Sequence, residues 1–169
     1  MKLTDSRRLT GPNLILDGPG AAAEIALPDA QCNFVAAIWQ AKVRILLSAI
    51  GWERETTALR FYEGGMTIAI TAPMDALYAA TEIVEAAWDL AEADINGSSE
   101  PDVAAIIDAL QKEISEERSP QLLALQEAAN SHGVSLLPDD EFITLGLGRG
   151  SRSWPVDDMP APEDVNWAE

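Results

Sequence analysis

The sequence is poor in cysteine, histidine and basic residues, and each shortage excludes a class of protein. Cys32 is the only cysteine, so the chain cannot form an internal disulfide, and its place in a predicted apolar helix favours a buried thiol over a nucleophile. His132 is the only histidine and has no apparent Ser or Cys partner for nucleophilic catalysis. Lysine and arginine number 11 against 28 acidic residues, a net charge of −17. Such a charge repels phosphate backbones, so nucleic acid is not an expected partner.

Long apolar runs are absent as well. No stretch approaches the roughly 18 apolar residues that a membrane-spanning helix needs, and the first eight residues lack the apolar core of a signal peptide. We therefore expect a cytoplasmic protein that makes no membrane contact. With 47% hydrophobic residues over 169 positions, the chain can bury one sizeable core, and its composition argues against disorder.

Turn residues and apolar periodicity divide the chain into elements. Short strands broken by turns are predicted within 2–27, and single strands for 58–62, 66–71, 134–137 and 142–145. Helices are predicted for 29–50, 73–95, from Ser99-Glu100-Pro101-Asp102 onward, and from Ser119-Pro120 to Gly133. In the first of these helices the core-facing spacing includes Phe34, Val35 and Trp39. Strands at both ends and helices between them predict an α+β fold, with about four helices packed on a mostly antiparallel or mixed sheet.

The chain is expected to consist of one domain and a tail. Residues 1–150 form the predicted domain, and 151–169 form an extended, Pro-rich acidic tail. Trp154 and Trp167 lie in this tail, and we expect them to dock on an apolar surface or on a partner.

The predicted helix 73–95 has one acidic side and one apolar side. At about 100° per residue, the acidic side carries Asp75, Tyr78, Glu82, Glu85, Asp89 and Glu92. The opposite side carries Leu77, Ala80, Val84, Ala87, Trp88 and Ala91. The acidic side is either a solvated surface or a binding surface for a cationic ligand, with Tyr78 able to stack on a cation.

Motifs near the two ends of the chain resemble a known family. They are Arg7-Arg8-Leu9-Thr10-Gly11-Pro12-Asn13 and the strand that leads into Leu145-Gly146-Leu147-Gly148. Nearly the whole chain is similar to the amino-terminal domain of cyanophycin synthetase and related amide ligases. In that family the domain precedes ATP-using ligase domains. This sequence has neither an ATP-grasp domain nor the Gly-x-Gly-Lys-Thr loop of a Mur-type ligase, so a free-standing domain that does not activate carboxylates is expected.

The resemblance also implies what the second helix lacks. Some family members carry a His-x-x-Glu-His motif there and use zinc to cut the polymer into primers. The alignment implied by the resemblance places Ala79, Glu82 and Ile83 at those positions, so only the Glu remains. Because the chain has no second histidine, hydrolysis by that mechanism is disfavoured, and no metal or other cofactor is expected.

The resemblance and the acidic helix together predict a non-catalytic accessory domain. Its partner would be an arginine-rich peptide polymer or a separately encoded Mur-type or ATP-grasp ligase subunit. Two alternatives stay open: an isopeptide hydrolase that keeps Glu82 as its base and recruits a metal differently, and a purely structural assembly domain. The oligomeric state is also open, a homo-oligomer included.

A few cationic and polar residues are further candidates for contacts with a partner or an anion. Arg8 and Asn13 lie in the first motif, and the arginine either serves binding or pairs with nearby acidic residues. Arg149 and Arg152 follow the glycines of the second motif, which lacks the Lys-Ser/Thr of a phosphate-binding loop. That segment is either a structural turn or a contact for a carboxylate or a partner protein.

Overall fold

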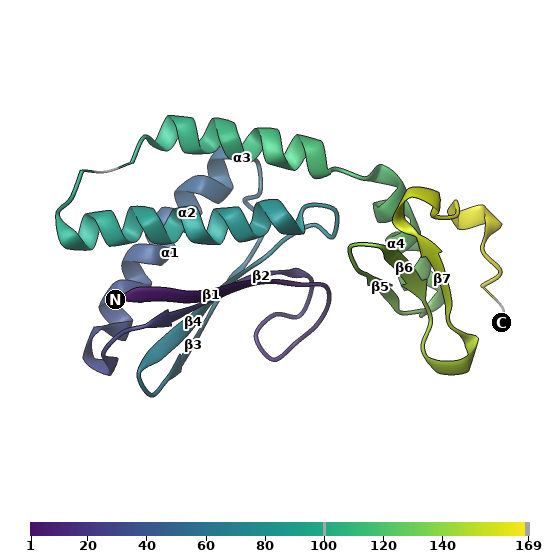
Figure 1. Cartoon of the computed structure of the whole chain (residues 1–169), viewed down its shortest axis with the longest axis horizontal. Helices are drawn as coiled ribbons and strands as arrows, with labels where there is room; N and C mark the ends of the chain where they lie inside the picture. The colour runs from purple at the N-terminus through teal and green to yellow at the C-terminus, as the bar shows by residue number, and fades with distance from the viewer. Residues whose placement is uncertain (100, 168–169) are drawn as a thin grey trace. The chain divides into compact units, whose positions relative to one another are not determined.

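Figure 1 shows the chain as a computed structural model that describes residues 1–99 and 101–167. The described residues form four α-helices, a four-stranded sheet and a three-stranded sheet, with every strand pairing antiparallel. The α+β class predicted from the sequence is therefore confirmed. The expected sheet is divided in two, and each sheet belongs to its own compact unit, residues 1–117 and 118–169.

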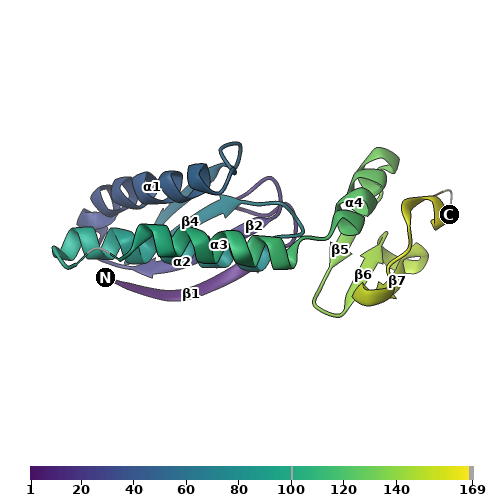
Figure 2. The same ribbon diagram turned by 90° about the horizontal axis from the view of Figure 1, so that it is seen from above.

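The first unit is a sheet covered on one face by helices (Figures 1 and 2). Its strands, in spatial order, are β1 (Lys2–Leu9), β2 (Gly20–Ala26), β4 (Gly65–Thr71) and β3 (Thr57–Tyr62). Its helices are α1 (Cys32–Ala49), α2 (Leu77–Asn96) and α3 (Val103–Glu117). The first two helices pack on the sheet and on each other, and α3 packs on α2.

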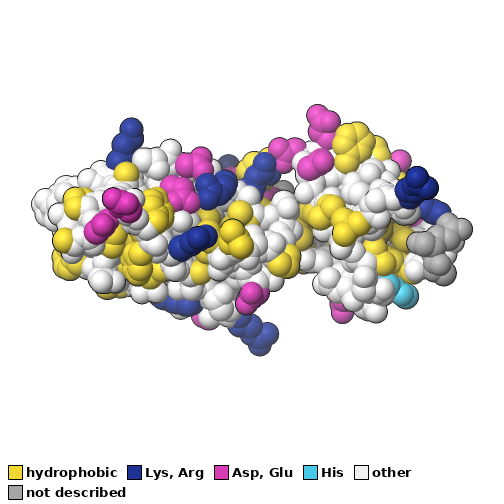
Figure 3. All heavy atoms as spheres, turned by 90° about the horizontal axis from the view of Figure 1, so that it is seen from below, with side chains coloured by type: hydrophobic (Ala, Val, Ile, Leu, Met, Phe, Trp, Pro, Cys, Tyr) yellow, Lys and Arg dark blue, Asp and Glu magenta, His cyan; other side chains and the backbone are white. Residues whose placement is uncertain are grey.

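The two central strands are apolar on the side that meets the helices. Side chains alternate between the two faces of a strand, so Ile25, Ile68 and Ile70 share the helix-facing side and are fully buried. Trp39 of α1 and Ile83 of α2 are fully buried as well. The opposite face of the sheet, seen in Figure 3, carries acidic and basic side chains beside hydrophobic ones.

The second unit contains α4 (Pro120–His132) and a sheet in the order β5 (Leu136–Pro138), β6 (Phe142–Leu145) and β7 (Arg152–Pro155). The expected limits of α4 are confirmed. Ser119 accepts a hydrogen bond from the backbone N–H of Leu122, and Gly133 ends the helix with a φ of 68°, which only glycine adopts readily.

Parts of the predicted tail, residues 151–169, form regular structure and pack within the second unit. Arg152–Pro155 form strand β7, which pairs with β6 and places Trp154 opposite Ile143. The Trp167 ring stacks on His132 with centroids 5.0 Å apart, and its indole N–H donates to the Pro162 carbonyl. The tail folds back because β6 offers a free edge and α4 offers an aromatic surface, so both tryptophans have contacts within the chain.

Several element boundaries differ from the expected ones. A short 3₁₀ turn, Asp29–Gln31, precedes α1, and Phe34 is 62% exposed, so its expected place in the core is wrong. Helix α3 begins at Val103, where Asp102 accepts hydrogen bonds from the N–H groups of Ala104 and Ala105. Glu100, in the expected start of this helix, lies outside the described residues. Among the residues that the structure describes, no helix combines the length and apolar character needed to cross a membrane.

Candidate functional site

The exposed side of α2 carries a row of carboxylates, Glu82, Glu85, Asp89 and Glu92, called here the acidic stripe. Residues spaced three or four apart on a helix are surface neighbours, and this spacing follows directly from the sequence. The apolar residues expected on the opposite side of α2 are all buried. The predicted division of this helix into an acidic side and an apolar side therefore holds from Leu77 onward.

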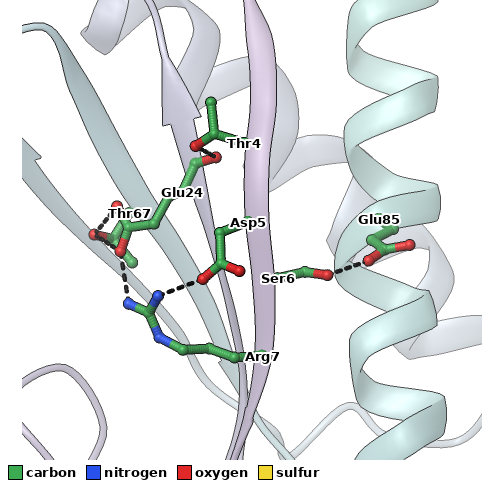
Figure 4. Close-up of polar contacts among 7 residues, drawn as sticks. All are labelled: Thr4, Asp5, Ser6, Arg7, Glu24, Thr67 and Glu85. Atoms are coloured by element: carbon green, nitrogen blue, oxygen red, sulfur yellow. Dashed lines mark hydrogen bonds and ion pairs between the residues drawn. The ribbon is translucent and has the colours of Figure 1, made fainter.

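A hollow of about 350 Å³ lies between the acidic stripe and β1. Glu85, Asp89 and Glu92 line it from α2, together with Trp88, and Met1, Lys2 and Leu3 line it from β1 and the chain start. The Ser6 hydroxyl of β1 donates a hydrogen bond to Glu85 (Figure 4). This bond fixes one carboxylate at the rim and leaves the side chains of Asp89 and Glu92 facing the same hollow.

A second hollow, of about 430 Å³, lies between α2 and α3. Two carboxylates line it, Glu82 from α2 and Glu113 from α3, and the rest of its wall is apolar: Ala86, Ile106, Ala109 and Leu110. The small alanine side chains leave room for an alkyl chain beneath the two carboxylates. Such a combination suits an amphipathic cation better than a bare ion.

Crowding of like charges changes the acidity of the stripe. Burial, Glu85 and Glu113 raise the pKa of Glu82, and burial, Glu92 and Glu85 raise the pKa of Asp89. A bound cation would relieve the repulsion among these carboxylates. Both pKa values shift in the same direction, whereas an acid and base pair needs two carboxyl groups whose pKa values are pushed apart. The two raised pKa values therefore do not indicate an acid and base pair.

Tyr78 lies at the first turn of α2, and its ring already contacts a cation of the same chain. The Arg8 guanidinium of β1 lies over this ring, 3.8 Å from its centroid. Arg8, expected to contact a partner or an anion, thus contacts α2. Tyr78 has one face covered, so only the rest of the ring is open to a further cation.

Asp75 does not belong to the acidic stripe. Its side chain is buried, at 5% exposure, because it precedes α2, which begins at Leu77. A rotation of about 100° per residue applies only within a helix, and Asp75 lies two residues before Leu77. The open N–H groups of the first turn, those of Tyr78 and Ala79, instead donate to the Glu117 carboxylate of α3 at 2.8 and 2.9 Å.

The remaining predicted contact residues belong to elements other than α2. Asn13 organises a turn: its side chain accepts from the N–H groups of Ile15 and Leu16 and donates to the Gly11 carbonyl. Arg149 and Arg152 are exposed residues of the second unit, in the 3₁₀ turn Gly148–Gly150 and at the start of β7.

Sequence reasoning missed Lys2, Ser6 and Glu113, which flank the acidic stripe. Each belongs to an element other than α2, and periodicity within one helix carries no information about its neighbours in space. Within β1, the adjacent residues Ser6 and Arg7 face different sides of the sheet (Figure 4), and since both are polar the sequence gives no sign of which one faces α2.

The three positions aligned with the zinc motif do not share a surface. Ala79 and Ile83 are fully buried against the core, whereas Glu82 is exposed. Within the described ranges 1–99 and 101–167, no group of three His, Cys, Asp or Glu side chains is arranged to hold a metal ion.

Comparison with known proteins adds no assignment. No family model matches the chain, and no curated protein matches it. The resemblance to the amino-terminal domain of cyanophycin synthetase stays a hypothesis drawn from the two terminal motifs.

Proposed function

We propose that the first unit is a non-catalytic binding domain that holds an arginine-rich peptide polymer along the acidic stripe of α2. The observation that carries this proposal is the alignment of four carboxylates between two hollows, with raised pKa values at Glu82 and Asp89. Such a row of negative charges attracts a ligand that carries several positive charges.

Arginine suits this surface better than a simple cation. Its planar guanidinium can donate two parallel hydrogen bonds to one carboxylate, and its alkyl stem can pack on apolar walls. The hollow between α2 and α3 offers both features, with Glu82 and Glu113 above Ala86 and Ala109. Within the chain itself, the Arg8 guanidinium of β1 packs on Tyr78 of α2 and so gives an example of a guanidinium bound against this helix.

The two terminal motifs extend the proposal to a biological setting. They support a cytoplasmic role as the accessory domain of a cyanophycin-synthetase-like amide ligase system. In this setting the domain would hold the growing polymer for a Mur-type or ATP-grasp ligase subunit. Catalysis would then belong to the ligase, and the domain would supply a high local concentration of the polymer.

The test is binding of a fluorescently labelled deca-arginine peptide, followed by anisotropy. The combined variant Glu82→Gln, Glu85→Gln and Asp89→Asn should weaken binding at least about tenfold, because it removes three neighbouring charges and keeps the shape of the side chains. Added salt should weaken binding to the wild type more than to the variant. A deca-lysine peptide should bind less tightly than deca-arginine.

The matched control removes three charges from the second unit. Asp157→Asn, Asp158→Asn and Glu163→Gln alter exposed residues and change the net charge by the same amount. This control should bind deca-arginine like the wild type. Equal weakening by both triple variants would mean that the net charge attracts the peptide, and the proposal for the acidic stripe would be rejected.

A further inference from the structure

The face of the sheet away from the helices has a polar cluster of its own. Strand pairing places Asp5, Glu24, Thr67 and Arg60 in one row across all four strands. Arg7 and Tyr62 flank this row on the two edge strands. Figure 4 shows that β1 separates this cluster from Ser6 and α2. The cluster is therefore independent of the acidic stripe.

The carboxylate of Glu24 is saturated by neighbours of the same chain. Arg7 donates to it at 2.7 Å, and the buried Thr67 hydroxyl lies 3.0 and 3.1 Å from its two oxygens. Burial and a hydrogen bond to Glu24 raise the pKa of Tyr62, so this hydroxyl keeps its proton and remains a donor. The second branch of the Arg7 guanidinium donates to Asp5 at 2.7 Å. These side chains hold one another in place through hydrogen bonds, and together they form a polar surface on this face of the sheet.

Arg60 differs from the other charged residues of this face. Within the described ranges it makes no hydrogen bond or ion pair, and it lies directly beside Thr67 on the neighbouring strand. It lines a hollow of about 500 Å³ together with Arg7 and Glu24. Arg7 is already paired with both Glu24 and Asp5, so Arg60 is the cation of this wall that has no partner among the described residues.

The other end of the hollow is apolar. Leu9, Leu14 and Ile15 line it, and Leu14 is 90% exposed. The loop that carries Leu14 and Ile15 is held by the Asn13 side chain, which accepts hydrogen bonds from two backbone N–H groups. Asn13 also lines the hollow. The loop therefore forms one wall of the hollow, and its Leu14 side chain is exposed to solvent.

A glycine shapes the polar end of the same hollow. Gly65 pairs with Tyr62 across the hairpin, and a Cβ at Gly65 would lie 2.8 Å from the Tyr62 hydroxyl. Only glycine leaves the space that this ring occupies. The Tyr62 ring therefore lies down on the sheet, beside Arg60, and extends the floor of the hollow.

We infer that this hollow binds a small monocarboxylate with an apolar body. The carboxylate pairs with the Arg60 guanidinium, and the apolar body lies toward Leu9, Leu14 and Ile15. A volume of about 500 Å³ is typical of small-molecule sites. A cation is disfavoured because the Glu24 carboxylate is already saturated. A phosphate dianion is disfavoured because one unpaired guanidinium would balance only half of its charge in an acidic protein.

The test compares a charged probe with its neutral counterpart on the full chain. 4-Phenylbutyrate and 4-phenylbutyramide have nearly the same shape, and only the first carries a charge. Each is titrated up to about 10 mM, a range suited to a ligand of this size, while backbone amide resonances are followed by NMR. The acid should shift amides near residues 13–15, 60–62 and 67, and should bind at least about tenfold more tightly than the amide.

Two variants complete the experiment. Arg60→Gln should abolish the preference for the acid, whereas Arg54→Gln, at another exposed arginine, should preserve it. The inference is overturned if the wild type binds both probes equally, if neither binds, if Arg60→Gln keeps the preference, or if the shifted amides lie outside this hollow. Because the hollow and the acidic stripe lie on opposite sides of the sheet, these outcomes do not depend on the binding of deca-arginine.

Discussion

Trp39 combines the best-buried aromatic surface of the first unit with an unsatisfied polar atom. Its side chain is fully buried in α1, and its indole N–H has no hydrogen-bond partner among the described residues. Burying a large ring stabilises the core. Leaving a donor without a partner costs about 1–3 kcal/mol. The two contributions of this residue therefore oppose each other.

The substitution Trp39→Phe separates these contributions. It removes the N–H group and keeps an aromatic ring, so the free energy of unfolding should change by less than about 1 kcal/mol. Trp39→Ala removes the ring as well and should cost about 3–5 kcal/mol. Urea denaturation followed by circular dichroism measures both values. A loss of several kcal/mol for Trp39→Phe would show that the N–H group is satisfied after all.

At the scale of the element, α2 shows which features a sequence can reveal. Its buried and acidic sides follow from spacing within the helix, so Val84 and Glu85 were placed correctly. Its first residue and the capping of its N-terminus were not predictable, because the Glu117 carboxylate comes from 38 or 39 residues further along the chain. The hollow lined by Arg60 was not predictable for the same reason. The order of the strands brings residues that are distant in sequence together, and periodicity within one strand does not reveal that order.

The raised pKa values of Glu82 and Asp89 predict how the stability of this element varies with pH. Within the window between their ordinary values, 4.5 and 3.8, and their raised values, the folded state binds more protons than the unfolded state. Stability therefore falls as the pH rises through this window, and the full penalty remains above it. The variant Glu82→Gln with Asp89→Asn should be more stable than the wild type at pH 7, and this gain should shrink as the pH falls through the window and vanish below 3.8, the ordinary pKa of Asp89.

Denaturation curves across this pH range measure the difference. Burial is the largest cause of both raised pKa values, and the neighbouring carboxylates Glu85, Glu92 and Glu113 add to it. A control variant, Glu127→Gln with Asp157→Asn, removes two exposed charges elsewhere and should show no such gain at pH 7. A gain that persists unchanged at pH 4 would contradict the assigned cause, because protonated carboxyl groups repel no neighbour.

At the scale of the whole molecule, the chain consists of two units, and each has a sheet with its own pairing. The sequence patterns placed a boundary at residue 150, whereas the compact units are divided between residues 117 and 118. Composition marks the Pro-rich segment that follows residue 150 as different. It does not show that β7, within that segment, pairs with β6 and so belongs with residues 118–150.

This division predicts that residues 1–119 fold by themselves. The fragment retains every pairing of the four-stranded sheet, the three helices of the first unit and the Glu117 cap on α2. It should unfold in one cooperative thermal transition. Within the fragment, Glu117→Ala should lower the free energy of unfolding by about 1–2 kcal/mol, because two N–H groups of α2 lose a charged acceptor. Glu116→Ala, which alters an exposed neighbour on α3, should have less effect. A fragment that is unfolded under native conditions would show that the first unit depends on the second for its stability.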